Sequence, residues 1–176
     1  MQTSNTGHHL TILEIRRERW PIEAACAARA AAIAAAIVAR PALRDAYIEL
    51  HGPLGAGKTT FVRHLLHALG VPGRVKSPTY AVMEAYDLPV SGETFEIRHF
   101  DFYRFDNPQE WEDAGFREVF AGPALKLAEW PEKAAGFLPV ADLRIEIEIE
   151  PDAGEARAVV LHASTARGVA LLGSAP

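Results

Sequence analysis

Residues 51–61, which read HGPLGAGKTTF, constrain this chain more than any other stretch of its sequence. Gly52, Gly57, Lys58 and Thr59 satisfy the pattern G-x-x-x-x-G-K-[ST]. Glycines allow backbone N–H groups to turn inward around phosphate oxygens, and a helix that begins near Lys58 would offer further N–H groups to the same anion. The stretch therefore predicts a phosphate-binding loop between a strand and a helix.

The segments on either side of this loop have the required character. AYIEL, residues 46–50, is a short strand candidate that runs directly into the loop. Beyond it, apolar residues recur with helical spacing from Lys58 to Leu69, and Gly70 is expected to end that helix. The order strand, loop, helix predicts an α/β fold.

The remaining segments predict a mixed β-sheet flanked by helices, with a C-terminal β-hairpin. The expected strands cover residues 10–15, 46–50, 81–88, 94–104, 124–130, 143–150 and 156–163, and the expected helices begin near residues 21, 58 and 107. The first helix is rich in alanine, and its expected apolar face consists of Ile22, Cys26, Ala30, Ile33 and Ile37. We expect one domain over residues 1–176, with a core at roughly 45–150 and an N-terminal strand and helix at 10–40.

Composition limits the class of protein. The single cysteine, Cys26, excludes an internal disulfide and favours a reducing compartment, so we expect a cytoplasmic protein. The alanine-rich stretch is interrupted by Arg29, which leaves a run too short to cross a bilayer. A net charge of −5 argues against a large nucleic-acid footprint, although a local basic strip remains compatible with it.

The loop predicts specific ligand contacts. The Lys58 ammonium is expected to reach the β- and γ-phosphates of a nucleotide, and the Thr59 hydroxyl to ligate Mg²⁺. The other loop residues expected to line the phosphates are Pro53, Leu54, Gly55, Ala56, Gly57 and Thr60.

Two acids outside the loop are candidates for catalysis. Asp101 stands in the apolar run HFDFYR, where a buried carboxylate needs Mg²⁺, hydrogen bonds or an ion pair with Arg98 or Arg104. Glu129 ends an apolar strand, and α/β sheets place their ligands at the carboxyl ends of strands. Either acid is a candidate for holding Mg²⁺ or orienting the attacking water.

Four ordered segments resemble one known family. GPLGAGKTT, SPTY, HFDFYR and EWPE, at residues 52–60, 77–80, 99–104 and 129–132, resemble the motifs of the TsaE family, the small bacterial ATPases of tRNA threonylcarbamoyladenosine synthesis. No N-K-x-D motif typical of GTPases and no L-S-G-G-Q motif typical of ABC ATPases accompanies them.

The resemblance implies a P-loop ATPase that binds ATP or ADP with Mg²⁺. It would act with two paralogous partners of sugar-kinase-like fold (TsaD and TsaB type), meeting tRNA indirectly and resetting the partner complex that modifies adenosine 37. Thr79 resembles a switch residue that responds to the γ-phosphate, or else belongs to an ordinary Pro-containing turn. Trp130 either packs beside the nucleotide or is a core aromatic. Because no arginine finger is obvious in the chain, hydrolysis is expected to be slow alone and stimulated by the partners.

Two alternatives share the loop. A small-molecule kinase needs an acceptor site and a basic lid, and residues 87–94 are too short for a lid. A nucleotide-gated interaction module would bind without turnover. The positions of Asp101 and Glu129 distinguish hydrolysis from binding alone. Acids that face the metal would support hydrolysis, whereas acids in structural ion pairs would support the interaction module.

Overall fold

The computed structural model describes residues 11–173. A seven-stranded mixed sheet in the order β1-β7-β6-β2-β5-β4-β3 forms its centre. The strands are β1 (Glu14–Trp20), β2 (Tyr47–His51), β3 (Met83–Val90), β4 (Glu93–Asp101), β5 (Leu125–Glu129), β6 (Leu143–Ile149) and β7 (Arg157–Ala163). The helices are α1 (Glu23–Ala39), α2 (Lys58–Leu69), α3 (Pro108–Asp113), α4 (Phe116–Ala121) and α5 (Ala166–Leu171), with short 3-10 turns at Pro41–Asp45 and Pro131–Ala134.

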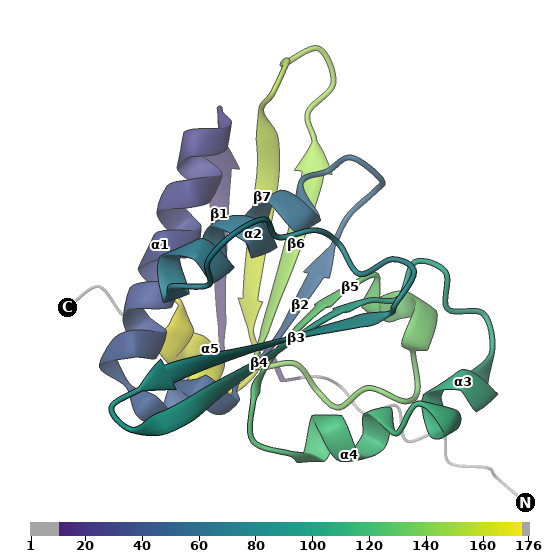
Figure 1. Ribbon diagram of the computed structural model, residues 1–176. Coiled ribbons are helices and arrows are strands. Elements are labelled where there is room, and N and C mark those ends of the chain that lie inside the picture. The colour runs from purple at the N-terminus through teal and green to yellow at the C-terminus, as the bar shows by residue number, and fades with distance from the viewer. Residues whose placement is uncertain (1–10, 174–176) are drawn as a thin grey trace, which may run out of the picture.

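Helices cover both faces of the sheet, as expected for an α/β fold (Figure 1). On one face, α1 and α2 pack their apolar residues against β2 and its neighbours, and Ile33, Phe61 and Leu50 are fully buried there. On the other face, α3 and α4 enclose an aromatic cluster made of Tyr47, Phe100, Phe102, Phe105, Trp111 and Phe116. The sheet is thus buried at its centre, where every residue of β5 is buried and no residue of β2 is exposed, even though each strand contains polar residues.

The central strands run parallel and set the position of the phosphate-binding loop. β2 pairs in parallel with both β5 and β6, and β4 pairs in parallel with β5. The carboxyl ends of β2, β4 and β5 therefore meet at one edge of the sheet. The loop leaves β2 at this edge and leads into α2, which begins at Lys58 and ends at Leu69 as expected. Gly70 follows with φ 101°, the left-handed conformation that glycine adopts without strain.

The two expected hairpins are confirmed. β3 and β4 are antiparallel and are joined by a turn at Ser91 and Gly92. Both strands therefore extend further into the connection than expected. β4 ends at Asp101 rather than at Arg104. β6 and β7 are also antiparallel. Asn107 caps α3 by accepting a hydrogen bond from the Gln109 backbone N–H at 2.9 Å, and Gly115 separates α3 from α4.

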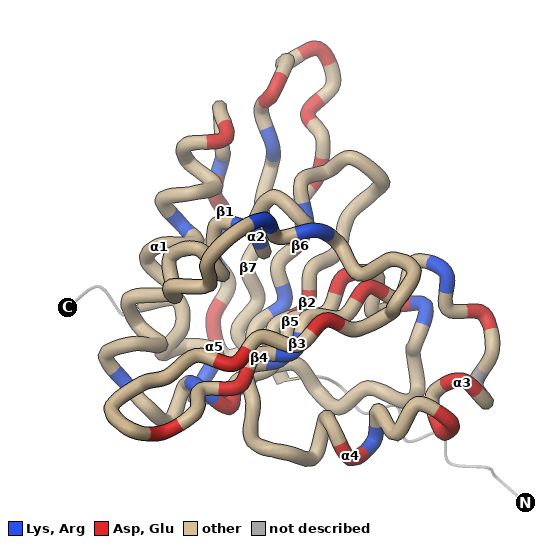
Figure 2. Tube along the Cα trace, viewed as in Figure 1, with Lys and Arg blue, Asp and Glu red and all other residues tan. Residues whose placement is uncertain are grey.

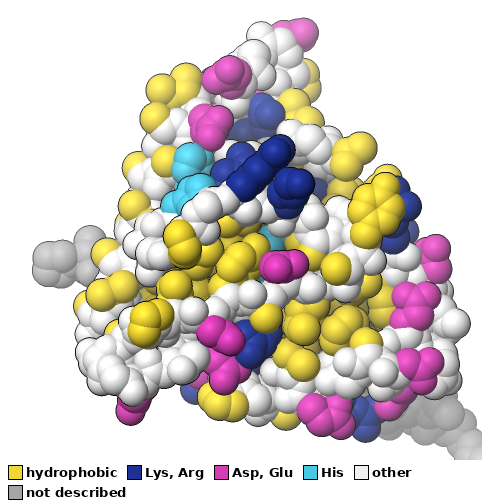
Figure 3. Space-filling model, viewed as in Figure 1, with side chains coloured by type: hydrophobic (Ala, Val, Ile, Leu, Met, Phe, Trp, Pro, Cys, Tyr) yellow, Lys and Arg dark blue, Asp and Glu magenta, His cyan; other side chains and the backbone are white. Residues whose placement is uncertain are grey.

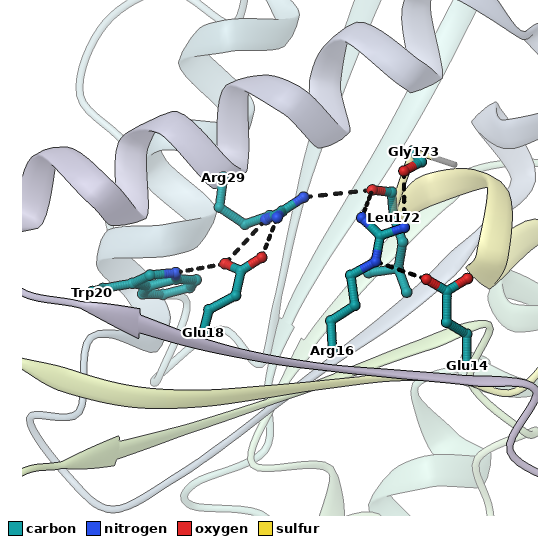
Figure 4. Close-up of polar contacts among 7 residues, drawn as sticks. All are labelled: Glu14, Arg16, Glu18, Trp20, Arg29, Leu172 and Gly173. Carbon is teal, nitrogen blue, oxygen red and sulfur yellow. Dashed lines mark hydrogen bonds and ion pairs between the residues drawn. The ribbon is translucent and has the colours of Figure 1, made fainter. Parts of the chain in front are cut away.

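The expected N-terminal strand at residues 10–15 is wrong in its bounds. The strand runs from Glu14 to Trp20 and pairs antiparallel with β7, while Leu10 lies outside the described residues. Its charged residues break the apolar pattern typical of a strand, because Glu14, Arg16 and Glu18 are half-buried on the face that α1 and the end of α5 cover (Figure 4). Ile22, expected on the buried face of α1, is 55% exposed because the helix begins only at Glu23.

Polar contacts hold β1 against α1 and the end of α5 (Figure 4). Arg16 donates to Glu14 at 2.7 Å and to the carbonyls of Leu172 and Gly173 at 2.8 and 2.9 Å. Nearby, the Glu18 carboxylate accepts from Arg29 of α1 and from the Trp20 indole N–H at 2.9 Å. Because each of these partly buried charges has a partner, a strand this polar can still line the covered face of the sheet.

No helix in residues 11–173 is both long enough and apolar enough to cross a membrane.

Candidate functional site

The candidate site is a pocket of about 330 Å³ at the carboxyl ends of β2, β4 and β5. It is lined by the loop and the start of α2, by Ser77 and Thr79 on the connection to β3, by Asp101 and Tyr103, and by Glu129 and Trp130. The structure thus brings together residues from all four segments that the sequence analysis singled out. This is the crevice position at which α/β sheets place ligands.

Lys58 lies at the floor of the pocket and is 5% exposed. Its ammonium donates to the carbonyls of Gly52 and Pro53 at 2.6 and 2.9 Å. Burial lowers the pKa of Lys58 from its usual value, and the nearby carboxylates, Glu129 foremost, oppose that shift. The result is a desolvated cation that faces the space in front of the loop.

Thr59 and Glu129 are in direct contact. The Thr59 hydroxyl donates to Oε2 of Glu129 at 2.8 Å, and Oε1 of Glu129 lies 2.8 Å from Nε2 of His99. Glu129 and His99 are both buried. In P-loop proteins Mg²⁺ is bound by hard oxygen ligands. The adjacent Thr59 hydroxyl and Glu129 carboxylate provide such ligands, so these residues fit that ion. Among the described residues no group of three His, Cys, Asp or Glu is placed so that it could hold a metal ion.

Asp101 lies beside Glu129, because the two residues are register partners across β4 and β5. It is 3% exposed and accepts hydrogen bonds from the hydroxyls of Ser77 and Thr79, the latter at 2.7 Å, and from the Tyr103 backbone N–H at 2.9 Å. The alternative ion pairs do not form. Arg98 instead contacts Asp87 and Glu96.

Trp130 follows β5 with φ 55° and ψ 44°, a conformation that costs free energy for a bulky residue. This backbone directs its ring over the Lys58 ammonium, 3.8 Å from the ring centroid, and beside Tyr103 at 4.9 Å between ring centroids. The half-buried ring therefore lines the pocket and also packs against the aromatic cluster on that face of the sheet.

A second pocket of about 230 Å³ adjoins the first across the loop. Gly55, Gly57 and Thr60 line both pockets, and the second is completed by residues of β1, α1 and the start of β7: Trp20, Ile22, Glu23, Cys26, Glu155 and Arg157. The Arg157 guanidinium donates to the Ala56 carbonyl at 2.8 Å. Sequence patterns gave no signal for this pocket, because β1 and β7 reach the loop only through the sheet order. Ser77 was also missed as an Asp101 partner, although it stands in the SPTY segment.

The comparisons with known proteins identify the family. The family model described as threonylcarbamoyl adenosine biosynthesis protein TsaE matches residues 23–159. The tRNA threonylcarbamoyladenosine biosynthesis protein TsaE of Haemophilus influenzae is 44% identical over 106 residues, which are 60% of this chain and 65% of that protein. The protein of the same name from Bacillus subtilis is 37% identical over 101 residues, 57% of this chain and 60% of that protein. The matched regions thus span less than two thirds of these relatives.

A solved structure shares the fold. The crystal structure of YdiB from Bacillus subtilis superposes with a TM-score of 0.65 at 24% identity, covering 90% of this chain and 91% of that one. At this identity the likeness supports the fold alone. The family match runs from the start of α1 into β7 and includes every residue that lines the two pockets except Trp20 and Ile22, so that this chain belongs to the TsaE family.

Proposed function

We propose that this chain is a Mg²⁺-dependent ATPase that supports threonylcarbamoylation of adenosine 37 in tRNA by resetting a partner complex between turnovers. The observation that carries the proposal is the contact between Thr59 and Glu129 at 2.8 Å, beside the buried Lys58 ammonium. A phosphate cation, a metal-binding hydroxyl and a carboxylate are the parts that P-loop ATP hydrolysis requires.

The residues have separate roles in this proposal. Loop residues 54–60 enclose the phosphates with their N–H groups, Pro53 lies at the entry of the loop, and Lys58 neutralises charge on the β- and γ-phosphates. Thr59 and one carboxylate hold Mg²⁺, which when bound neutralises the charge that develops during phosphoryl transfer. The second carboxylate orients the attacking water, and Trp130 covers the phosphate side of the pocket.

Thr79 has the role of a switch in this proposal. Its hydroxyl is bonded to Asp101 at 2.7 Å, on the connection between α2 and β3. A γ-phosphate would compete for the Thr79 hydroxyl and thereby reposition this connection.

The second pocket is suited to the adenine base. It begins at the loop residues that line the phosphate pocket, and it ends at the Trp20 ring, which is stacked in parallel with Phe61 at 5.9 Å between centroids. A base that entered between Trp20 and Arg157 would place its triphosphate along the loop. A reaction on tRNA, together with a single cysteine, fits the cytoplasm.

The partners proposed are a threonylcarbamoyl-transferase subunit of sugar-kinase-like fold and its paralogue. The test is ATP hydrolysis by the purified chain, alone and with that complex and tRNA, with Lys58→Ala as the control. We expect slow basal turnover that the complex stimulates and the substitution abolishes. Phosphate transfer to a small acceptor without stimulation would support a kinase, and tight binding without turnover would support a nucleotide-gated module.

A further inference from the structure

Charge is distributed unevenly along the chain. Residues 51–83 contain four Lys or Arg residues and no Asp or Glu, although the whole chain has a net charge of −5. Lys58 is buried in the loop, whereas Arg74 and Lys76 are exposed and Arg63 is half-buried on α2. Figure 2 shows the connection after α2 with Lys and Arg positions and without an acidic one. We call Arg63, Arg74 and Lys76 the basic face.

The charges of the basic face are not used within the fold. Among the described residues, Arg63, Arg74 and Lys76 form none of the ion pairs, which involve other arginines and lysines of the chain. Lys and Arg side chains gather over the connection after α2 in the space-filling view, next to His side chains (Figure 3). Such a group of uncompensated cations on an acidic protein favours binding to a polyanion.

An exposed aromatic side chain stands at the end of the same connection. Tyr80 is 84% exposed, and the Arg104 guanidinium lies over its ring at 4.3 Å from the centroid and 3.3 Å from its hydroxyl. An exposed ring paired with a guanidinium provides a flat surface on which an unpaired nucleic-acid base can stack. Neither residue is buried in the nucleotide pocket, so both are free to meet a partner.

We infer that the basic face and the Tyr80–Arg104 pair form a direct binding surface for the sugar–phosphate backbone of RNA. This inference rests on the proposed function, because the RNA is taken to be the tRNA of that reaction. Three cations can pair with a short run of phosphates, and the exposed ring can stack on an unpaired base. Binding to an acidic protein surface would need the cations but not the ring. The surface is small, which is consistent with the acidic charge of the rest of the chain.

The experiment measures binding of a fluorescently labelled, unmodified tRNA transcript to the full chain by anisotropy between 50 and 200 mM KCl. For three phosphate contacts, log Kd is expected to rise with log[KCl] with a slope of about 2 to 3. The variant Arg63→Gln/Arg74→Gln/Lys76→Gln should weaken binding by about tenfold or more at the lowest salt and reduce the slope to below about 1.

The matched control is Arg17→Gln/Arg40→Gln/Lys133→Gln. It removes the same number of positive charges from exposed positions that also form no ion pair among the described residues. We expect its affinity to stay within about twofold of the wild type. Thermal unfolding and basal ATP hydrolysis, measured on both triple variants, should match the wild type, because neither set of residues belongs to the pocket.

Three outcomes would overturn the inference: no RNA binding by the wild type at 50 mM KCl, equal loss of binding in both triple variants, or unchanged RNA binding in the first variant with loss of stimulation by the partner complex. The last outcome would assign the basic face to an acidic protein instead. Hydrolysis without RNA binding refutes this inference alone, whereas RNA binding through the basic face without hydrolysis refutes the proposed ATPase alone.

Discussion

Arg157 shows how a residue distant in sequence supports the phosphate-binding loop. Its guanidinium donates to the carbonyl of Ala56 at 2.8 Å and lies 3.4 Å from the carbonyl oxygen of Gly55. Because each peptide unit is planar, a carbonyl held by Arg157 also fixes the direction of the N–H group of the next residue. Arg157 therefore stabilises the conformation of the loop that can bind an anion.

Arg157→Ala is expected to weaken binding of both ADP and ATP by about tenfold, equivalent to ~1.4 kcal/mol. Arg157→Lys should recover part of the affinity, since an ammonium can still reach one carbonyl. Isothermal titration calorimetry provides the measurement, with the exposed Arg144→Ala on β6 as control. Wild-type affinity in Arg157→Ala would show that the loop needs no such support.

Cys26 is expected to react slowly with iodoacetamide. Burial raises the pKa of its thiol to about 12, and the thiolate is the reactive form. At pH 8 only about one molecule in ten thousand would be the thiolate, and the rate should rise roughly tenfold per pH unit up to pH 10. Because the raised pKa keeps the proton on the folded state while the unfolded state loses it above pH 9, this thiol also makes stability fall as the pH rises from about 9 to 12.

Mass spectrometry of alkylated protein measures this reactivity, and protein unfolded in urea serves as the fast-reacting control. Because Cys26 lines the second pocket, added ATP should slow alkylation further. Faster alkylation of Cys26 with ATP than without it would mean that the adenine base binds outside the second pocket.

At the scale of elements, the loop depends on β6. A Cβ built on Gly52 would lie 2.2 Å from the carbonyl oxygen of Ile147, and Gly52 has φ 138°. The close approach of two backbones leaves no room for a side chain, so the first glycine of the loop is required by packing as well as by conformation. Gly55 has φ 79° but meets nothing within 4 Å.

Gly52→Ala is therefore expected to lower the free energy of unfolding by more than about 3 kcal/mol and to abolish nucleotide binding. Gly55→Ala carries only the backbone strain and should cost about 1 kcal/mol. Urea denaturation of the two variants makes the comparison. Equal losses would mean that conformation alone, without the contact to β6, explains the glycine.

The elements differ in how far the sequence determines them. α2 and β5 could be predicted because apolar periodicity and a terminal glycine or proline mark them locally. β1 could not be placed, because its charged residues are paired with Arg29 and with carbonyls of the C-terminal segment, contacts that only the folded chain creates. The short α5 carries too few residues to show a period.

At the scale of the whole molecule, the sheet order determines what the candidate site contains. Glu129 could be predicted at the site because it ends an apolar strand, whereas Asp101, expected inside a strand that continued to Arg104, lies beside it because β4 ends at Asp101 and pairs in parallel with β5. Trp20 and Arg157 could not, since they reach the loop only because β1 and β7 form the far side of the sheet. Local motifs thus reveal the phosphate side of the site, and tertiary structure supplies the side proposed for the base.

We propose that this site hydrolyses ATP with Glu129 at the metal and water side of the phosphates. The most direct test is phosphate release from Mg²⁺-ATP by wild type and Glu129→Gln, together with the ATP affinity of each. We expect the substitution to lower the turnover rate at least about a hundredfold while ATP affinity changes by less than about tenfold. Turnover at the wild-type rate in Glu129→Gln would contradict it.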